Sequence, residues 1–270
     1  MKKRSFAFLI ICVLVAVPAF ANDLFLKLDN YFIAVNDKIS VKILNGSFQA
    51  SEGAVTIARI RDVSVVSPKG ERTNPKETDF TKDDKTSFLN LQPTEEGNYV
   101  VGLSTMTREI DLEAKDFNEY LSHDGIPDTL AERKRDKELN KKVRDRDAKH
   151  VKNILPVGEK PSDTYKPALG YPVEIVPVTN PYSLKMGDTF EFQCLKDGKP
   201  LINQFVMTGR EDATGKLIVG KNIRTNKNGT AKIKLDGAGK WYVRFINMTR
   251  LTDPNLNYES KWATLTFQIK

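Results

Sequence analysis

The chain has 270 residues, of which 29% are charged and 40% hydrophobic, and its formal net charge at pH 7 is +7. This length allows two ordinary domains with cores of their own. The positive charge is local, because residues 131–152 contain ten Lys or Arg and five Asp or Glu. Without this segment and the three cations at positions 2–4, the formal charge is −1 (7 − 5 − 3). The net charge therefore does not indicate a nucleic-acid partner, and a solvated, mixed-charge surface explains the segment.

Residues 1–21 have the pattern of a secretory signal peptide. The cations at positions 2–4 precede an apolar run, 6–17, that is too short to span a bilayer comfortably. The run ends in Pro-Ala-Phe-Ala, a small-x-small cleavage pattern. The sequence therefore predicts cleavage after Ala21, a periplasmic location, and a mature chain that starts at Asn22 without a transmembrane segment.

A single cysteine, Cys194, follows the predicted cleavage site. An intrachain disulfide is then impossible, and the exported protein must rely on its apolar core. Cys194 lies in an alternating run, 189–195, in which a small buried hydrophobic role is typical of a free cysteine.

Short alternating segments bounded by Gly, Asn and Pro follow one another along the chain. Residues 37–44 place Ile39, Val41 and Ile43 on one face and polar side chains on the other, which is typical of a strand with one solvated face. Similar segments recur at regular spacing up to the last strand, 261–269. The pattern predicts a mainly β protein built from β-sandwiches.

Two stretches recur in the same order. Residues 31–44 match 182–195 without gaps in a Tyr, an Asp and the final Leu, and residues 97–108 match 239–250 from a shared Gly to a shared Met-Thr-Arg. A tandem duplication is therefore predicted. We expect two immunoglobulin-like or prealbumin-like sandwiches, and one rigid superposition should fit both pairs of stretches. The sandwiches would span residues 22–158 and 169–270, with 159–168 as the linker.

The first sandwich is expected to carry a helical insert. After the second copy a short loop, 251–260, leads to the last strand, whereas the same position in the first copy holds residues 109–150. Residues 116–119 form a capping-box pattern, and Phe117, Tyr120 and Leu121 share one helical face, by which we expect the insert to dock.

A second helix is predicted from Asp128 to about residue 152. Only Leu139 and Val143 form an apolar stripe on it. We therefore expect this basic helix to face solvent or a partner, the whole insert to contribute little burial, and the first sandwich to fold without the insert.

Several longer stretches resemble a known family. They are DLFLK at 23–27, ILNGSF at 43–48, AKDFNEYL with HDGIPD at 114–128, LGYPVEIVP at 169–177 and YESKWATLTF at 258–267. The chain is similar there to a bacterial exported family of uncharacterised function, commonly described by analogy as the periplasmic component of a nickel/cobalt uptake transport system. The resemblance covers nearly all of the mature chain. It implies a periplasmic β-sandwich protein with an inner-membrane transporter or a surface protein as partner.

The resemblance also suggests where a metal would bind. Many members of the family have His directly after the cleavage site, whereas this chain has Asn22 and so lacks that imidazole. His123, Asp124 and Asp128 are the remaining candidates for nickel or cobalt ligands, since imidazole suits these ions. The alternative interpretation is that Asp124 and Asp128 cap helices and that His123 ends one.

A second group of candidate residues lies around the two Met-Thr-Arg corners. Arg108 could pair with Glu109 or Asp111, and Arg250 with Glu259, either as a ligand site or as ion pairs that fix the loop ends. We expect any site to lie where the insert meets the interface between the domains. The full set of ligand or partner candidates is Arg108, Glu109, Asp111, Arg250, Tyr258, Glu259 and Lys261.

Catalytic motifs are not found. The sequence has no Gly-x-Ser-x-Gly elbow and no phosphate-binding loop, and its two histidines, His123 and His150, offer few arrangements for a triad. We therefore expect a non-enzymatic binding protein, with divalent metal uptake as its role. The alternative is a structural or cell-surface interaction scaffold that binds no metal.

Overall fold

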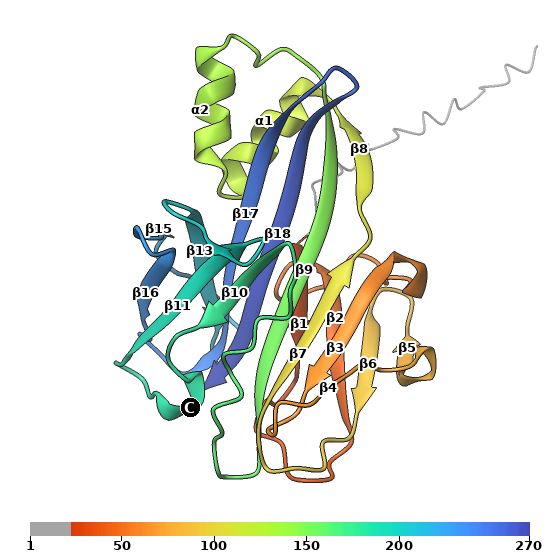
Figure 1. Ribbon diagram of the computed structural model, residues 1–270, viewed down its shortest axis with the longest axis vertical. Coiled ribbons are helices and arrows are strands. Elements are labelled where there is room, and N and C mark those ends of the chain that lie inside the picture. Colours follow the sequence, from red (N-terminus) through yellow and green to blue (C-terminus); the bar gives the residue numbers. More distant parts are fainter. Residues whose placement is uncertain (1–22) are drawn as a thin grey trace, which may run out of the picture.

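The computed structural model describes residues 23–270, so the predicted signal peptide and its cleavage site lie outside the described residues. The protein is mainly β, as predicted (Figure 1). The elements of the first half are β1 (Asp23–Lys27), β2 (Ile39–Gly46), β3 (Ile60–Val66), β4 (Arg72–Thr73), β5 (Phe80–Lys82), β6 (Ser87–Leu91), β7 (Gly97–Thr105), β8 (Arg108–Leu112), α1 (Ala114–His123), α2 (Pro127–Arg135) and β9 (Val143–Val157). Those of the second half are β10 (Val173–Pro177), β11 (Thr189–Lys196), β12 (Lys199–Pro200), β13 (Phe205–Glu211), β14 (Leu217–Val219), β15 (Ile223–Arg224), β16 (Thr230–Lys234), β17 (Gly239–Asp253) and β18 (Leu256–Ile269). Short 3-10 turns occupy Ile57–Arg59, Glu77–Asp79 and Pro181–Ser183. Within the described range, no helix has both the length and the apolar character needed to cross a membrane.

One continuous sheet joins the two halves. Its strand order is β14-β13-β17-β18-β9-β7-β3-β4, and the halves meet where β18 pairs with β9 in parallel. A covering sheet of order β1-β2-β6-β5 belongs to the first half, and a second one, β10-β11-β12 with β16 beside β11, belongs to the second half. The two predicted sandwiches therefore share their central layer, which we call the shared sheet.

The pairing pattern repeats between the halves. The antiparallel pairs β1–β2, β2–β6, β3–β7 and β7–β9 recur as β10–β11, β11–β16, β13–β17 and β17–β18. The glycine that opens the repeated motif has φ of 133° at Gly97 and 134° at Gly239, in the left-handed region that favours glycine. This topology agrees with the predicted duplication, while the single rigid superposition stays a prediction.

The two covering sheets lie on opposite faces of the shared sheet. Alternate residues of β7 and β9 divide between two cores, because successive side chains of a strand point to opposite faces. Val101 and Leu155 belong to the core of the first half, whereas Val100 and Ile154 pack with the second half. Cys194 lies fully buried in this second core, in the predicted small hydrophobic role.

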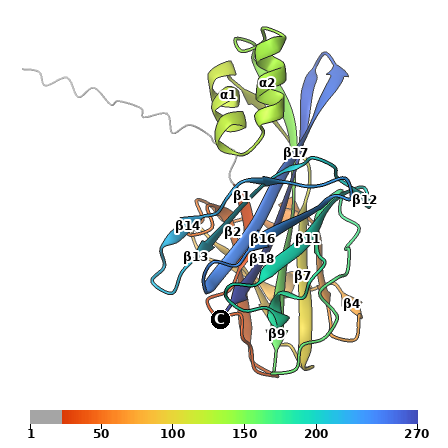
Figure 2. The same ribbon diagram turned by 90° about the vertical axis from the view of Figure 1, so that its left-hand side faces the viewer.

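The predicted basic helix is wrong beyond residue 135. Residues 143–150 form the first part of β9, and β17 and β18 continue through the predicted 251–260 loop as a long hairpin (Figures 1 and 2). The alternation has a period of two, with Val143, Asp145 and Asp147 buried and Arg144 exposed. Three of the five charged side chains in 143–150 are buried, so the segment lacks the alternation of apolar and polar residues that predicts a strand.

The insert docks through the predicted residues but is far from superficial. Phe117, Tyr120 and Leu121 are at most 2% exposed and pack on β17 and β18. The Tyr120 ring stacks on Trp262 with centroids 5.6 Å apart. Arg133 of α2 is 1% exposed and lies over the Phe117 ring. The expectation that the insert contributes little burial is therefore wrong, because its helices complete a core on the hairpin of the other half.

Candidate functional site

The predicted metal residues are held by different partners. His123 is exposed at the end of α1, Asp124 accepts a hydrogen bond from Arg244 Nη2 at 3.2 Å, and both Asp128 oxygens pair with Arg224 at 2.8 Å. In residues 23–270 no group of three or more His, Cys, Asp or Glu side chains is arranged to hold a metal ion. The structure therefore does not bring these three residues together as a ligand set.

The residues of the first Met-Thr-Arg corner pair differently from the prediction. Arg108 donates to Asp147 Oδ1 at 2.9 Å instead of pairing with Glu109 or Asp111. Those two carboxylates, two residues apart on β8, both face Arg144 at 3.2 and 3.7 Å. All of these pairs tie β8 to β9.

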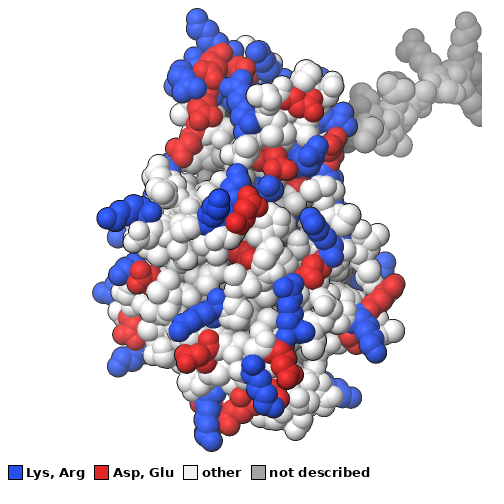
Figure 3. All heavy atoms as spheres, in the orientation of Figure 1, with Lys and Arg blue, Asp and Glu red and all other residues white. Residues whose placement is uncertain are grey.

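The second corner also differs. Arg250 pairs with Asp136 and Glu138, at 2.9 and 2.7 Å, and so anchors the segment after α2. Glu259 pairs instead with Lys261 at 2.8 Å. Tyr258 is buried, with its ring centroid 5.1 Å from that of Phe117. Acidic and basic side chains interleave over the visible face of the molecule, including the two helices, so this face shows no large patch of one sign (Figure 3).

A buried charge cluster lies where the insert meets both halves. It comprises Asp23, Asp124, Asp145, Asp147, Lys149 and Arg244. Arg244 links Asp23 of β1 to Asp124 after α1, at 3.1 and 3.2 Å. Asp145, Asp147 and Lys149 are each at most 3% exposed, and Lys149 Nζ lies 4.5 Å from the centroid of the Trp262 ring. These residues come from β1, β9, β17 and the end of α1.

Burial shifts the pKa values in this cluster. It raises the pKa of Asp23 to about 6, against the attraction of Arg244, and that of Asp145 to about 7, against a hydrogen bond from Ser260. Burial lowers the pKa of Lys149 to about 8. On the opposite face of β9, burial lowers the pKa of His150 to about 4, helped by Lys261, and Ser104 Oγ lies 2.9 Å from His150 Nδ1. Shifts of this kind occur in functional sites and also in structural ion-pair networks.

Replacing Asp145 with Asn should remove part of the pH dependence of stability. The folded pKa of about 7 exceeds the unfolded value of about 3.9. The stabilising contribution of the protonated carboxyl is therefore full below pH 4 and is lost as the pH rises to 7. Relative to the wild type, the Asn variant should gain on the order of 4 kcal/mol between pH 4 and 8. Urea unfolding across this range measures the gain; the exposed Asp111→Asn is the control, and equal slopes for both variants would contradict the assignment.

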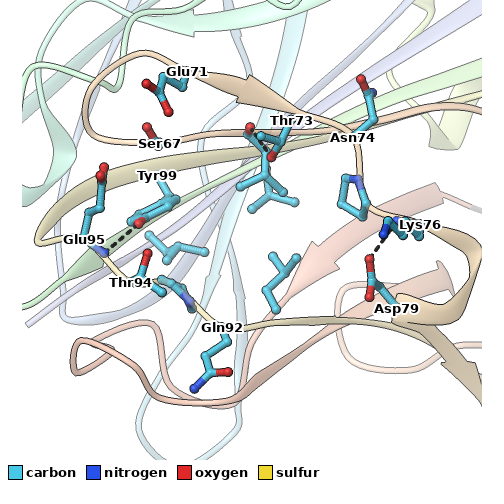
Figure 4. A pocket seen from close by; sticks show the side chains of 16 residues that line it. Ser67, Glu71, Thr73, Asn74, Lys76, Asp79, Gln92, Thr94, Glu95 and Tyr99 are labelled. Atoms are coloured by element: carbon cyan, nitrogen blue, oxygen red, sulfur yellow. Dashed lines mark hydrogen bonds between the residues drawn. The ribbon is translucent and has the colours of Figure 1, made fainter.

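An open slot lies elsewhere, between the shared sheet and the covering sheet of the first half (Figure 4). We call it the first-half slot; it has a volume of about 380 Å³, and its lining includes Val65, Ser67, Leu91, Tyr99, Val101 and Leu155. Tyr99 OH accepts a hydrogen bond from the Glu95 backbone N–H at 3.0 Å, which fixes the ring on one wall. Size, an apolar floor and a polar rim are the usual attributes of a small-molecule site. We take this slot as the candidate site, because Asp145, Asp147 and Lys149 at the centre of the charge cluster are at most 3% exposed.

The duplication provides a comparison inside the molecule. The corresponding second-half slot, with Thr208, Arg210, Ile218, Ile223, Ile233 and Trp241 in its lining, has a volume of only about 240 Å³. The repeat aligns Trp241 with Tyr99. Arg210 is the pairing partner of Trp241, and extending the pairing of Val66 with Val100 by one residue places Ser67 at the equivalent position. A larger ring and an arginine thus narrow the second slot, while the first stays open.

Sequence reasoning missed this site and placed it at the insert instead. Tyr99 and Trp241 lie inside the recognised repeat, so their difference in size was visible. Ser67 and Arg210 lie outside it, and only strand pairing makes them equivalent.

Comparisons with known proteins identify a family but no function. A family model described as "Domain of unknown function (DUF4198)" matches residues 19–249. No curated protein matches. A solved structure titled "Marsupial T cell receptor" shares 9% identity, with 90% of this chain and 73% of that chain covered and a TM-score of 0.20. A putative membrane anchored protein from Corynebacterium diphtheriae shares 9% identity over 90% of this chain and 53% of its own, with a TM-score of 0.19. These two scores are too low to support an argument.

Proposed function

The chain belongs to the DUF4198 family of unknown function, and we propose that it is an exported, non-enzymatic binding protein whose small-molecule ligand enters the first-half slot. The observation that carries the proposal is the contrast between the two slots. Duplicated sandwiches keep the same strand pairing, yet the slot is open where Ser67 and Tyr99 stand and narrow where Arg210 and Trp241 stand. Side chains that fill a slot remove the space in which a ligand could be desolvated.

The nickel/cobalt uptake role implied by the resemblance is not our proposal. Its candidate ligands Asp124 and Asp128 each pair with an arginine, which competes with a cation for the same oxygens. The apolar floor of the first-half slot suits an organic molecule better than a hydrated ion. Export to the periplasm remains part of the proposal and rests on the signal-peptide pattern of residues 1–21.

Exchange of the equivalent residues tests the proposal. Wild-type protein should bind the neutral apolar fluorophore 1-N-phenylnaphthylamine saturably, since the slot offers an apolar floor out of water. Ser67→Arg should weaken this binding at least tenfold by filling the slot as Arg210 does in the other half. The reverse exchange, Arg210→Ser, leaves the first-half slot intact, so binding should be no weaker than in the wild type.

A second variant protects the test against misfolding. Thr73 lies on the exposed edge strand β4 and lines the slot, so Thr73→Trp should fill the slot without disturbing the core. Thermal unfolding checks that each variant is folded. Absence of saturable binding by folded wild-type protein, or undiminished binding by both filled variants, would contradict the proposal and favour the scaffold alternative.

A further inference from the structure

The two slots differ in charge as well as in size. The charged residues that line the first-half slot are Glu71, Asp79, Glu95 and Lys76, a formal balance of −2. Those of the second-half slot are Arg210, Lys221, Lys232, Lys234 and Asp236, a formal balance of +3. The open slot is therefore acidic and the narrow one basic, although both derive from the same duplicated sandwich.

One of the acidic side chains, Glu95, has a carboxylate oxygen without a hydrogen-bond partner within residues 23–270. Glu95 Oε1 accepts from Lys69 Nζ, whereas Glu95 Oε2 is buried and has no hydrogen-bond partner among the described residues. An acceptor taken from water without a partner costs free energy, and a charged acceptor costs more than a neutral one. A ligand that brings an N–H donor into the slot would satisfy this oxygen. The Glu95 side chain as a whole is 28% exposed while Oε2 itself is buried, so the carboxylate has to turn toward the slot for a ligand to reach this oxygen.

The floor determines the rest of the ligand. Val65, Val101 and Leu155 line the slot from three neighbouring strands of the shared sheet. Tyr99 is a further lining residue, beside Glu95 (Figure 4). Val101 and Leu155 are already fully buried and Val65 is partly buried, so a planar or aliphatic ligand that covers this floor removes mainly its own apolar area from water. The carboxylates then stand at the rim, where the polar end of the ligand would emerge.

We propose that the first-half slot takes a small organic cation: an apolar body seated on Val65, Val101 and Leu155, with an ammonium or guanidinium group that donates to Glu95 Oε2. This inference rests on the proposed binding function and specifies its ligand class. Organic anions are disfavoured by the three rim carboxylates, and neutral molecules bind through the floor alone.

Three ligands of similar shape test the inference: 2-phenylethylamine, 2-phenylethanol and phenylacetate, each used to displace 1-N-phenylnaphthylamine. The amine should bind about tenfold more tightly than the alcohol, because it adds one charge-assisted hydrogen bond. Phenylacetate should bind more weakly than the alcohol. Glu95→Gln should remove the preference for the amine and leave the affinity of the alcohol within about twofold.

The control is Glu52→Gln, which makes the same change of charge at an exposed position outside the slot. It should keep the preference for the amine. Equal affinities of amine and alcohol, both abolished by Ser67→Arg, would overturn the cation inference while the binding function stands. If none of the three ligands displaces the fluorophore and the fluorophore itself does not bind, the proposed function fails too.

Discussion

Replacing Glu174 with alanine is expected to lower the free energy of unfolding by about 3 to 5 kcal/mol. Glu174 Oε2 accepts from Lys152 Nζ at 2.9 Å, and both side chains are 3% exposed. The same carboxylate accepts from the backbone N–H groups of Leu169 and Tyr171, both at 2.8 Å. Its removal leaves the two backbone donors without this acceptor, and leaves the buried Lys152 ammonium with the Pro167 carbonyl, 3.4 Å away, and no counter-charge. Burial lowers the pKa of Lys152, and the Glu174 carboxylate opposes this effect. Without the carboxylate, the pKa of Lys152 should be lower still.

Urea unfolding at neutral pH measures the loss. The control is Asp29→Ala, which breaks an ion pair of 2.6 Å with Lys42 in which the aspartate side chain is 80% exposed. Exposed pairs contribute about 0 to 1 kcal/mol, so this change should be small. Similar losses of unfolding free energy in the two variants would show that the Lys152–Glu174 pair does not stabilise the contact between β9 and the start of the second half.

Phe117→Ala is expected to cost about 3 to 5 kcal/mol as well, because it empties a fully buried position. The ring lies 5.1 Å from that of Tyr258 and beneath the Arg133 guanidinium, 5.0 Å away. Its loss should loosen the insert from the β17–β18 hairpin. Thermal unfolding measures the effect, with Val219→Ala, at a side chain that is 67% exposed, as the control.

The same contacts reverse an expectation drawn from the sequence alone. Replacing residues 109–150 with a short loop would uncover Tyr258, Trp262 and Ile246 and remove the first part of β9. We therefore expect the shortened chain not to fold cooperatively. A Phe117→Ala variant as stable as the Val219→Ala control would restore the view that the insert is dispensable.

The class of fold follows from the sequence because it depends on local patterns. Alternation with a period of two and the recurring Gly-x-aromatic motif are visible without a structure, and so is the apolar face of α1. Ion-pair partners are not visible in this way. Asp23 and Arg244 are 221 positions apart and meet only because β1 covers the shared sheet. The sequence predicts pairs for Arg108 and Arg250 among residues nearby in the chain, whereas strand pairing and helix docking determine their actual partners.

The buried charges explain why the sequence predicts a helix where β9 begins. Asp145, Asp147 and Lys149 point inward from β9, and their polarity resembles that of a solvated helix. Hydrophobic periodicity cannot identify a strand whose inner face is partly charged. The first-half slot cannot be predicted from the sequence for a related reason. It is open because Ser67 stands where the other half has Arg210, and only the strand register shows that these two positions are equivalent.

Mapping the binding of 2-phenylethylamine by methyl NMR tests the central claim most directly. The account predicts dose-dependent shifts of the Val65, Val101 and Leu155 methyl groups, which line the first-half slot, and none of these shifts in Ser67→Arg protein. Ile218 and Ile233 of the second-half slot should stay unchanged. Shifts confined to the second-half slot or to the insert, or shifts that persist in Ser67→Arg protein, would contradict the assignment of the first-half slot as the binding site.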